Sequence, residues 1–583
     1  MIAPAQGRGA PRAPLLRLSA ERIVLALLAL LILSVSVAPM LRLAQAALFD
    51  DGGLAVERLA RLFARPQTAA AIWNTVQIAL ASTLLSLLVG AGFAVVMVQT
   101  DLRGKSALVF AFVLPLMIPP QVTAMAWIQA LAPSGPLLGP VMGPLLDLIG
   151  LPIEAGARHP LYSRAGIILL LGIYNAPLVY LAMQASLRRI PLDLAEAARA
   201  AGAGPLRVLV TVILPLARGG LVAAAGLAFV SAIGNFGIQA MLGIPARVPT
   251  LMTQIYQQIN GLGPAALPNM AALSLVLTAL TVAGVLLATR AGAGADNRVN
   301  LGGRPLTLPL GRAGPVIGAA LWGYLAVALL LPLAALVQTS LVPAYGLPLT
   351  AETVTLKNYA AALLRQVSLR QAFVTSLWLT LVTVGLLTLV SVLLGYFLAW
   401  RRGPLVRLLQ FGCEAAYALP GITLGVAMIL LFLRPLPGLG LSIYGTPWII
   451  LAAYVAGFLA LALRPVLSGY AQIDRALEEA AQVAGAGFAR RMRDVIWPLI
   501  APTAIAAAVI VFMTAINEIQ TSILLISSGT RTIGPMIIFL EEGGASTLAA
   551  AVGCLMILGV LALMLLSVAL ARFLPRGVLP WQF

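Results

Sequence analysis

The sequence has little charge and almost none of the side chains on which redox and zinc chemistry depend. Only 10% of its 583 residues are charged, whereas 61% are hydrophobic and the mean hydropathy is +1.00. This composition excludes a water-soluble enzyme or a set of soluble domains. Cys413 and Cys554 both lie within apolar runs, and His159 is the only histidine. We therefore expect no disulfide and no zinc site, and the sequence offers no firm candidate for any other metal site.

A nucleotide-binding loop and a nucleic-acid-binding module are missing as well. The pattern G-x-x-x-x-G-K-[ST] occurs nowhere, so the chain has no P-loop with which to hydrolyse ATP. The formal net charge of +18 could suit nucleic acid, but no basic cluster is interleaved with aromatic residues. Membrane topology accounts for the charge better, and we expect no nucleic-acid partner.

Apolar runs long enough to cross a membrane are abundant. A spanning helix needs about 20 apolar residues, and twelve runs of this kind are visible. They lie near 23–41, 70–99, 106–131, 165–187, 217–243, 270–289, 315–341, 371–400, 405–433, 447–468, 500–527 and 548–571. The sequence therefore predicts an all-α polytopic membrane protein with about twelve transmembrane helices.

The positive charges fall mostly on one side of this topology. With the N-terminus inside, that side receives most of the 37 Lys and Arg residues, including those of the linker at 290–312 and Arg572 with Arg576. Because cytoplasmic loops retain Lys and Arg, we expect both termini to be cytoplasmic in a multi-pass inner (plasma) membrane protein. Ala44-Gln45-Ala46 could be a signal-peptidase site, but the apolar run before it is long enough to favour an uncleaved span.

An internal duplication divides the chain into two units. Residues 190–216 and 473–499 align without gaps at an offset of 283, with fourteen of twenty-seven positions identical. This indicates tandem six-span units at 1–300 and 301–583. Because six is even, the units run parallel and should be related by a pseudo-twofold axis along the membrane normal. Upstream the offset is 301, so the first unit carries an insertion within 131–165, either a docking surface for an outside partner or a passive loop.

Each duplicated segment is predicted to form a short helix that ends in a tight turn. Glu196 and Glu479 fall in the first turns, where the helix dipole favours a carboxylate. The alanines that follow leave room for another protein to approach closely. Gly202 and Gly485 can adopt the left-handed conformation that ends a helix. We expect a rigid projection from the membrane at each segment.

The two segments resemble the EAA loop of the permease subunits of type I ABC importers, which reads E-A-A-x-x-x-G with L-P downstream. The first copy matches fully, and the second has Trp497 in place of Leu before Pro498. The resemblance implies that each loop is a coupling helix that docks into a cytoplasmic ATPase. The residues that carry this role by match are Glu196, Ala197, Ala198, Gly202, Glu479, Ala480, Ala481 and Gly485.

The resemblance also implies partners and a cargo. ATP-Mg would bind a separate ATPase subunit, expected to be a homodimer, and this chain would bind no cofactor. A periplasmic substrate-binding protein would deliver the cargo, and lipid would surround the spans. Fused two-unit permeases of this kind look most like those for ferric iron, with relatives for thiamine, phosphonates such as 2-aminoethylphosphonate, and polyamines. Gln520 stands where the iron group often has Pro, which weakens the iron assignment.

Polar side chains inside predicted spans are candidates for the transport pathway, because a charge within a membrane is costly. At the repeat offset Glu518 falls on Asn235, so the two should face each other across the pseudo-twofold axis. The candidate set is Asn235, Gln239, Asn517, Glu518 and Gln520. Cargo contact and a structural hydrogen bond are both open for Glu518. Glu414 lies near the cytoplasmic end of its span, which favours a structural role.

The main rival from another class is a proton-coupled secondary transporter, which can also consist of two parallel six-span halves. Such a transporter has no use for duplicated coupling helices, so the loops favour the importer. An intramembrane enzyme fits less well, because the sequence contains neither a Ser/His/Asp set nor metal-ligand spacing.

Overall fold

The computed structural model describes residues 20–50, 53–132, 159–190, 192–259, 261, 265–292, 308–401, 403–435, 440 and 442–570. Several parts of the sequence discussed above lie outside these residues. They are the arginines before Ala20, most of the 290–312 linker, most of the 131–165 insertion, and Arg572 with Arg576.

Apolar helices dominate the described part of the chain. Nine are long and apolar enough to cross a membrane, and the number reaches twelve when three bent helix pairs are each counted as one span. The predicted all-α membrane fold is confirmed. Five of the nine are single helices: α4 (Pro66–Gln99), α8 (Arg164–Leu187), α15 (Ala266–Gly292), α19 (Val367–Trp400) and α22 (Pro447–Tyr470). Three join two helices each: Ala20–Leu48 contains α1 (Ala20–Ile32) and α2 (Ala38–Leu48), Ala313–Ser340 contains α16 (Ala313–Leu325) and α17 (Leu331–Ser340), and Phe488–Ile516 contains α24 (Phe488–Arg491) and α25 (Trp497–Ile516). The ninth is Ser546–Leu563, part of α28 (Ser546–Leu570).

The third span of each half is broken rather than merely kinked. Lys105–Met117, which begins with α5 (Lys105–Val113), meets α6 (Pro120–Ala130) at 107°. In the second half, α20 (Pro404–Ala418) meets α21 (Gly421–Phe432) at 115°. Prolines lie at both breaks, where a missing N–H and a fixed φ prevent the helix from continuing. Proline by itself accounts for a kink at these positions, and the structure turns the chain by more than a right angle at each.

The predicted fifth spans, 217–243 and 500–527, end earlier than expected. α12 (Arg218–Gly234) stops before Asn235, and α25 stops before Asn517. The apolar residues that continue each run belong to separate short helices instead. These are α13 (Phe236–Ala246) in the first half and α26 (Ser522–Leu525) in the second. A further short helix follows beyond the end of each run, α14 (Leu251–Gln258) and α27 (Ile533–Glu542). Hydropathy could not detect these breaks, because both sides of each are apolar.

Five π-helical turns occur in the described residues, and four of them precede a proline; the fifth, Ala361–Arg365, does not. The four span Leu33–Val37, Leu209–Ile213, Ala326–Leu330 and Met492–Ile496, and a proline follows each of them by two residues. Because proline has no N–H to donate, the preceding turn cannot close in the usual way and widens. Two of the turns recur at the offset of 283, so the duplication is present in backbone irregularities as well as in sequence.

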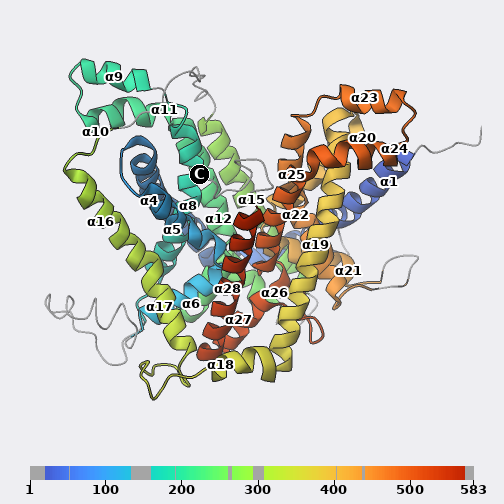
Figure 1. Cartoon of the computed structure of the whole chain (residues 1–583). Coiled ribbons are helices and arrows are strands. Elements are labelled where there is room, and N and C mark those ends of the chain that lie inside the picture. The colour runs from blue at the N-terminus through green and yellow to red at the C-terminus, as the bar shows by residue number, and fades with distance from the viewer. Residues whose placement is uncertain are drawn as a thin grey trace, which may run out of the picture.

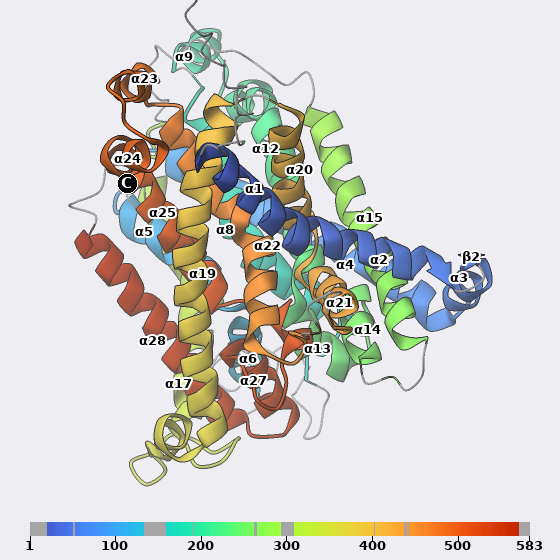
Figure 2. The same ribbon diagram turned by 90° about the vertical axis from the view of Figure 1, so that its right-hand side faces the viewer.

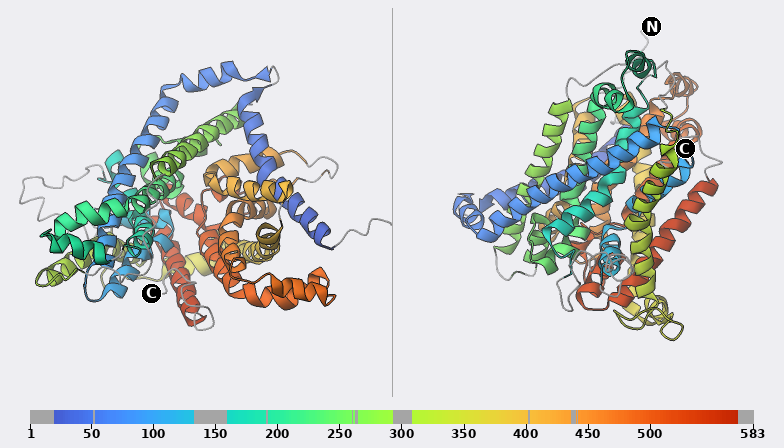
Figure 3. Two further views of the ribbon diagram at one scale, coloured as in Figure 1. Left: turned by 90° about the horizontal axis from the view of Figure 1, so that it is seen from above. Right: turned by 90° about the vertical axis from the view of Figure 1, so that its left-hand side faces the viewer.

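The first helix of each half packs against the other half. α1 contacts α19, α20 and α24, and Figure 2 shows it crossing in front of α19 and α22. α16 contacts α5 in the first half, and Figure 1 places it on the side of the molecule opposite α1. In the view from above, on the left of Figure 3, these two helices lie at opposite edges. The exchange joins the two halves into one body.

Equivalent hydroxyl groups anchor the chain after each fifth span. Thr75 Oγ1 on α4 accepts a hydrogen bond from the N–H of Leu251 at 2.9 Å, and Ser376 Oγ on α19 accepts one from the N–H of Ile533 at 2.9 Å. Each N–H belongs to the first residue of a helix and has no partner within it. Thr75 and Ser376 are matched at the upstream offset of 301, so the same hydroxyl position caps the same helix start in each half.

Aromatic rings fill the core of each half beneath the duplicated loops. Phe93 and Phe112 stack with ring centroids 3.8 Å apart, and Tyr180 meets both edge-on. In the second half Tyr396 meets Phe488 edge-on at 5.4 Å. Phe488 belongs to α24 itself, so the second loop is fastened directly to its aromatic core.

Candidate functional site: two exposed loops and a cavity between the halves

The duplicated segments form two helical projections on one side of the molecule. α9 (Leu192–Ala200) is followed by α10 (Pro205–Val208), and α23 (Ala476–Val483) is followed by α24. Figure 1 shows α9 and α23 at the same side of the molecule but far apart across it, with the two halves diverging towards them. We call this side the loop side.

The glycines of both loops have the conformation that the sequence predicts. Gly202 has a φ of 85° and Gly485 a φ of 81°, in the left-handed region that favours glycine. The N–H of Ala203 donates to the carbonyl of Ala198, and the N–H of Ala486 donates to that of Ala481, both at 3.0 Å. This hydrogen bond across six residues is typical of a Schellman C-cap. Both helices therefore end abruptly and in the same way.

The outer faces of the two loop helices carry the matched motif residues. Glu196 and Ala197 are exposed in the first loop, as are Glu479 and Ala480 in the second, while Ala198 and Ala481 are half-buried. Glu479 pairs with Arg475, one turn earlier, at 2.9 Å. Because both side chains are about half exposed, this surface pair is weak and can be exchanged for another partner. Each loop thus presents a carboxylate beside a flat alanine surface.

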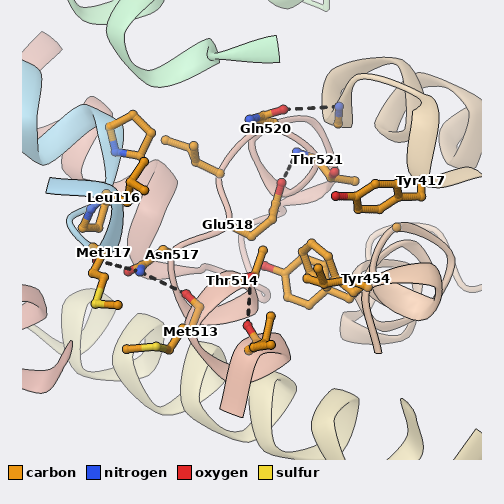
Figure 4. Close-up of a pocket in the computed structure, with 18 of the residues that line it drawn as sticks. Leu116, Met117, Tyr417, Tyr454, Met513, Thr514, Asn517, Glu518, Gln520 and Thr521 are labelled. Atoms are coloured by element: carbon orange, nitrogen blue, oxygen red, sulfur yellow. Dashed lines mark hydrogen bonds between the residues drawn. The ribbon is translucent and has the colours of Figure 1, made fainter. Parts of the chain in front are cut away.

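A cavity of 530 Å³ lies between the two halves, and no residue of the loop helices α9, α10, α23 or α24 lines it. Its walls come from the broken third span and α8 of the first half and from α20, α21, α22, α25 and the segment after α25 in the second. Figure 4 shows Glu518, Tyr454, Tyr417 and Thr514 gathered around it. Among the described residues that line this cavity, Glu518 is the one carboxylate and none is Lys, Arg or His.

Glu518 and Asn235 perform the same structural task in the two halves. The carboxylate of Glu518 accepts hydrogen bonds from the N–H groups of Thr521 at 2.5 Å and Ser522 at 3.1 Å. At the equivalent place Asn235 Oδ1 accepts one from the N–H of Ile238 at 3.0 Å. Both side chains satisfy N–H groups exposed by the break in the fifth span. Glu518 therefore has a structural role and also borders the cavity.

The remaining pathway candidates separate into two groups. Gln520 lines both the main cavity and an adjoining one of 300 Å³, and Asn235 lines the smaller of the two. Asn517 lines the main cavity and donates to the carbonyl of Met117 in the other half at 3.1 Å. Gln239 lines neither cavity: it is buried, and its amide donates to the carbonyls at the end of α12. Asn235 and Glu518 thus border neighbouring cavities rather than one.

Glu414 forms an ion pair with Arg464 at 2.9 Å, and the Arg464 guanidinium lies over the ring of Tyr417, 4.7 Å from its centroid. This supports the structural role expected for Glu414. Two further residues of the site carry no mark in the sequence: Tyr417, which borders both cavities, and Tyr454, which lines the main cavity together with Glu518. An aromatic residue in an apolar run gives no signal of its own before the fold is known.

No group of three or more His, Cys, Asp or Glu side chains that could hold a metal ion occurs within the described ranges. The other omission of the sequence analysis is an ion-pair network on the second loop that includes Glu478 and Arg491. The alignment of the two loops could have revealed this network, because the acid Glu478 and the base Arg491 replace Ala195 and Val208 of the first loop together.

Comparison with known proteins gives a family. The family model described as "Binding-protein-dependent transport system inner membrane component" matches residues 86–300 and again 391–579. Similar proteins include a probable ABC transporter permease protein, y4fN, of Sinorhizobium fredii, which is 30% identical over 530 residues, covering 88% of this chain and 89% of that protein. The ferric transport system permease protein FbpB of Actinobacillus pleuropneumoniae is 23% identical over 530 residues, covering 89% and 73%.

A shorter relative matches part of the chain. The molybdenum transport system permease protein ModB of Azotobacter vinelandii is 32% identical over 198 residues, which is 33% of this chain and 81% of that protein. The two segments matched by the family model together make up more than half of the chain and contain one duplicated loop each. The chain therefore belongs to the binding-protein-dependent transport system inner membrane components, as an ABC transporter permease with two tandem units.

Proposed function

We propose that the chain forms the membrane pathway of an importer for ferric iron, driven by a separate ATPase that grips α9 and α23. The observation that carries the ATPase coupling is the pair of exposed loop helices with the same cap and the same exposed glutamate on one side of the molecule. A rigid helix held clear of the membrane can transmit force to the spans behind it. The two related loops suit a homodimeric ATPase, since each copy then receives one loop.

In this proposal the loop side faces the cytoplasm, together with both termini, and the protein lies in the inner (plasma) membrane. The two halves diverge towards the loop side (Figure 1), which supports an inward-facing conformation in this proposal. ATP-Mg binds the partner ATPase and not this chain. Closure of the ATPase dimer draws α9 and α23 together and closes the cavity on the inner side. A periplasmic substrate-binding protein supplies the cargo from outside, and lipid covers the outer faces of the spans.

The charge of the main cavity supports a cationic cargo. Its described lining has one carboxylate, Glu518, and three tyrosines, Tyr174, Tyr417 and Tyr454, but no basic side chain. Oxygen donors of this kind suit a hard cation such as ferric iron. FbpB of Actinobacillus pleuropneumoniae matches 89% of this chain, so the resemblance extends over both units.

Molybdate is the second candidate, because ModB of Azotobacter vinelandii is 32% identical over 198 residues. An oxyanion would cross a cavity whose described walls offer no Lys, Arg or His to neutralise it, which favours iron. Thiamine, a phosphonate and a polyamine are the other cargoes of the resembled class. Thiamine and polyamines are cations, so a cavity with a carboxylate and no basic side chain in its described walls suits them better than an anionic phosphonate.

Reconstitution tests the proposal. The chain is placed in proteoliposomes with its ATPase and binding protein, and uptake of radioactive iron, molybdate and thiamine is measured with ATP, without ATP, and with a proton gradient alone. ATP-dependent uptake of iron is expected. Uptake of molybdate instead of iron would overturn the assignment of iron as the cargo. Uptake driven by the proton gradient without ATP would overturn the assignment as an ATP-driven importer and favour a secondary transporter.

A further inference from the structure

Four charged side chains connect the first span to the second loop. Glu21 on α1 pairs with Arg401, at the end of α19, at 2.7 Å, and with Arg491 on α24. Arg491 also pairs with Glu478 on α23, and the hydroxyl of Tyr396 donates to Glu478 at 3.1 Å. Glu21 and Arg491 are 470 residues apart in the chain. The network therefore joins the beginning of the first half to the loop of the second.

The centre of this network is buried. The side chains of Arg491 and Glu478 are each 5% exposed, and that of Glu21 is 21% exposed. Two acids and two bases balance each other in charge. A buried charge is tolerated only when it is paired, and removal of one partner from such a pair is strongly destabilising. Glu21 is thus held in place by the second loop, and the second loop by Glu21.

The first loop lacks this connection. Ala195 and Val208 take the places of Glu478 and Arg491, and both are fully buried. Among the residues that the structure describes, no ion pair joins α9 or α10 to the rest of the chain. Two loops that are similar outside are therefore fastened differently inside, one by buried charges and the other by apolar packing.

The segment before the first span of the second half is attached in a different way. The N–H of Leu308 donates to the carbonyl of Gln99 at 2.7 Å, and the N–H of Leu310 donates to Asp101 at 2.9 Å. These contacts reach the end of α4 but not the first loop. Only α1, within the described part of the chain, contacts a loop helix of the other half through a charged side chain.

We propose that Glu21 is a positioning residue for the second coupling loop, which makes the two loops mechanically unequal. The proposal rests on the proposed ATPase coupling for its consequence in transport, but not for the linkage itself. Force applied to α23 passes through Glu478, Arg491 and Glu21 to the first span, which also packs on α15 of the first half through α2. Force applied to α9 has no charged link of this kind.

Hydrogen exchange on the purified full-length chain tests the linkage without any partner. Glu21→Gln removes the charge that faces Arg491. Loss of a charge-assisted hydrogen bond makes local opening about tenfold easier, so exchange within 476–496 should rise about tenfold while exchange within 192–213 stays unchanged. The control is Glu57→Gln on α3 (Val56–Phe63), whose carboxylate is exposed and pairs with Arg61 one turn along the same helix. Unchanged exchange in 476–496, or an equal rise in both loops, would overturn the proposal.

A double variant tests whether Glu21 acts on the second loop through Arg491 or through a general effect on protein stability. Glu478→Ala with Arg491→Val copies the buried pair of the first loop and leaves no unpaired charge inside the loop. The buried hydroxyl of Tyr396 loses its acceptor, so thermal stability should fall somewhat, but less than in a variant that leaves Arg491 or Glu478 unpaired. The double variant should also lose the link to Glu21, so that adding Glu21→Gln has no further effect on exchange. A further rise on adding Glu21→Gln would overturn the proposal, because Glu21 would then act by another route.

Transport gives the functional measurement. In proteoliposomes with ATPase and binding protein, Glu21→Gln should keep ATP hydrolysis but lower uptake per ATP about tenfold, and Glu21→Asp should restore part of it. If the wild type shows no ATP-driven uptake, the proposed function fails while the exchange result stands. If the wild type transports and Glu21→Gln transports equally well per ATP, the positioning role fails.

Discussion

Ser186 on α8 occupies the space that a side chain at Gly220 on α12 would need: a Cβ added at Gly220 would lie 2.6 Å from Ser186 Oγ and overlap Ser186 Cβ. In the second half the sizes are reversed, because Gly469 on α22 faces Thr503 on α25. The same helix contact is thus built twice, with the larger side chain on opposite helices. Close approach of the two backbones requires one small residue, and either helix can supply it.

Gly220→Thr should therefore destabilise the first half by about 1–3 kcal/mol, as is usual for overpacking. Combining it with Ser186→Gly copies the arrangement of the second half and should restore most of the loss. Thermal unfolding of the detergent-solubilised protein, followed for both single variants and the double variant, gives the coupling energy. Additive effects in this double-mutant cycle would show that the two residues do not share one space.

Simultaneous replacement of Glu196 and Glu479 by Ala should uncouple the permease from its ATPase. Each carboxylate is exposed, and the weak pair of Glu479 with Arg475 can be exchanged. A charge-assisted hydrogen bond with a partner is worth about 1.5–3 kcal/mol, so uptake should fall by about tenfold or more. The protein should still be present in the membrane, because neither side chain packs inside it. Glu57→Ala is the matched control, and normal uptake by the double variant would contradict the coupling role.

Glu518→Gln distinguishes cargo contact from capping. An amide can cap the break, as Asn235 does in the first half, so thermal stability should change little. Uptake of a cationic cargo should fall about tenfold if the carboxylate touches it, since an ionic contact is worth roughly 1.5–3 kcal/mol. Glu518→Ala also removes the cap and should cost about 1 kcal/mol of stability. Wild-type kinetics in the Gln variant would assign Glu518 a capping role alone.

His159 makes stability depend on pH near the start of α8. Its Nε2–H donates to the carbonyl of Ile128 at 2.8 Å, and its Nδ1 accepts the N–H of Leu161 at 3.3 Å, an arrangement that requires the neutral ring. Burial lowers the pKa of His159. The unfolded chain therefore binds a proton more readily, so this contribution is complete above the unfolded pKa of about 6.5 and is lost as pH falls below it.

The measurement compares thermal unfolding of the wild type and His159→Gln from pH 7.5 to pH 5. The wild type should lose more stability than the variant over this interval. Glu541 and Glu542, whose pKa values are raised by burial, act in the opposite direction but are present in both proteins. Parallel curves would show that the ring does not resist protonation.

Much of the architecture was predictable because it depends on patterns among residues that are close together in the sequence. A run of about 20 apolar residues partitions into a membrane whatever its neighbours are, and Gly202 and Gly485 end their helices through their own backbone freedom. The breaks at 118–120 and 419–420 were partly visible, because proline marks them. Their angles were not, since proline prevents a straight helix without setting the direction of the next one.

The candidate site was less predictable. Gln239 was expected on the pathway because an amide in a span needs a partner, but its partners are backbone carbonyls at the end of its own fifth span. Glu518 and Asn235 were expected to flank the pathway at equivalent positions, and each of them caps a helix break beside one of two adjoining cavities. In both cases the sequence shows that a buried polar side chain needs a hydrogen-bond partner, but it does not show which group is that partner.

The sequence by itself determined the membrane class, the twofold repeat and the form of the loop helices, because hydropathy, duplication and capping depend on residues close together in the chain. Only the tertiary structure decided that the first spans exchange between halves, that the cavity has one carboxylate and no basic group in its described walls, and that Glu21 meets Arg491. Such contacts join residues hundreds of positions apart, and packing of the whole bundle, rather than any local preference, brings them together.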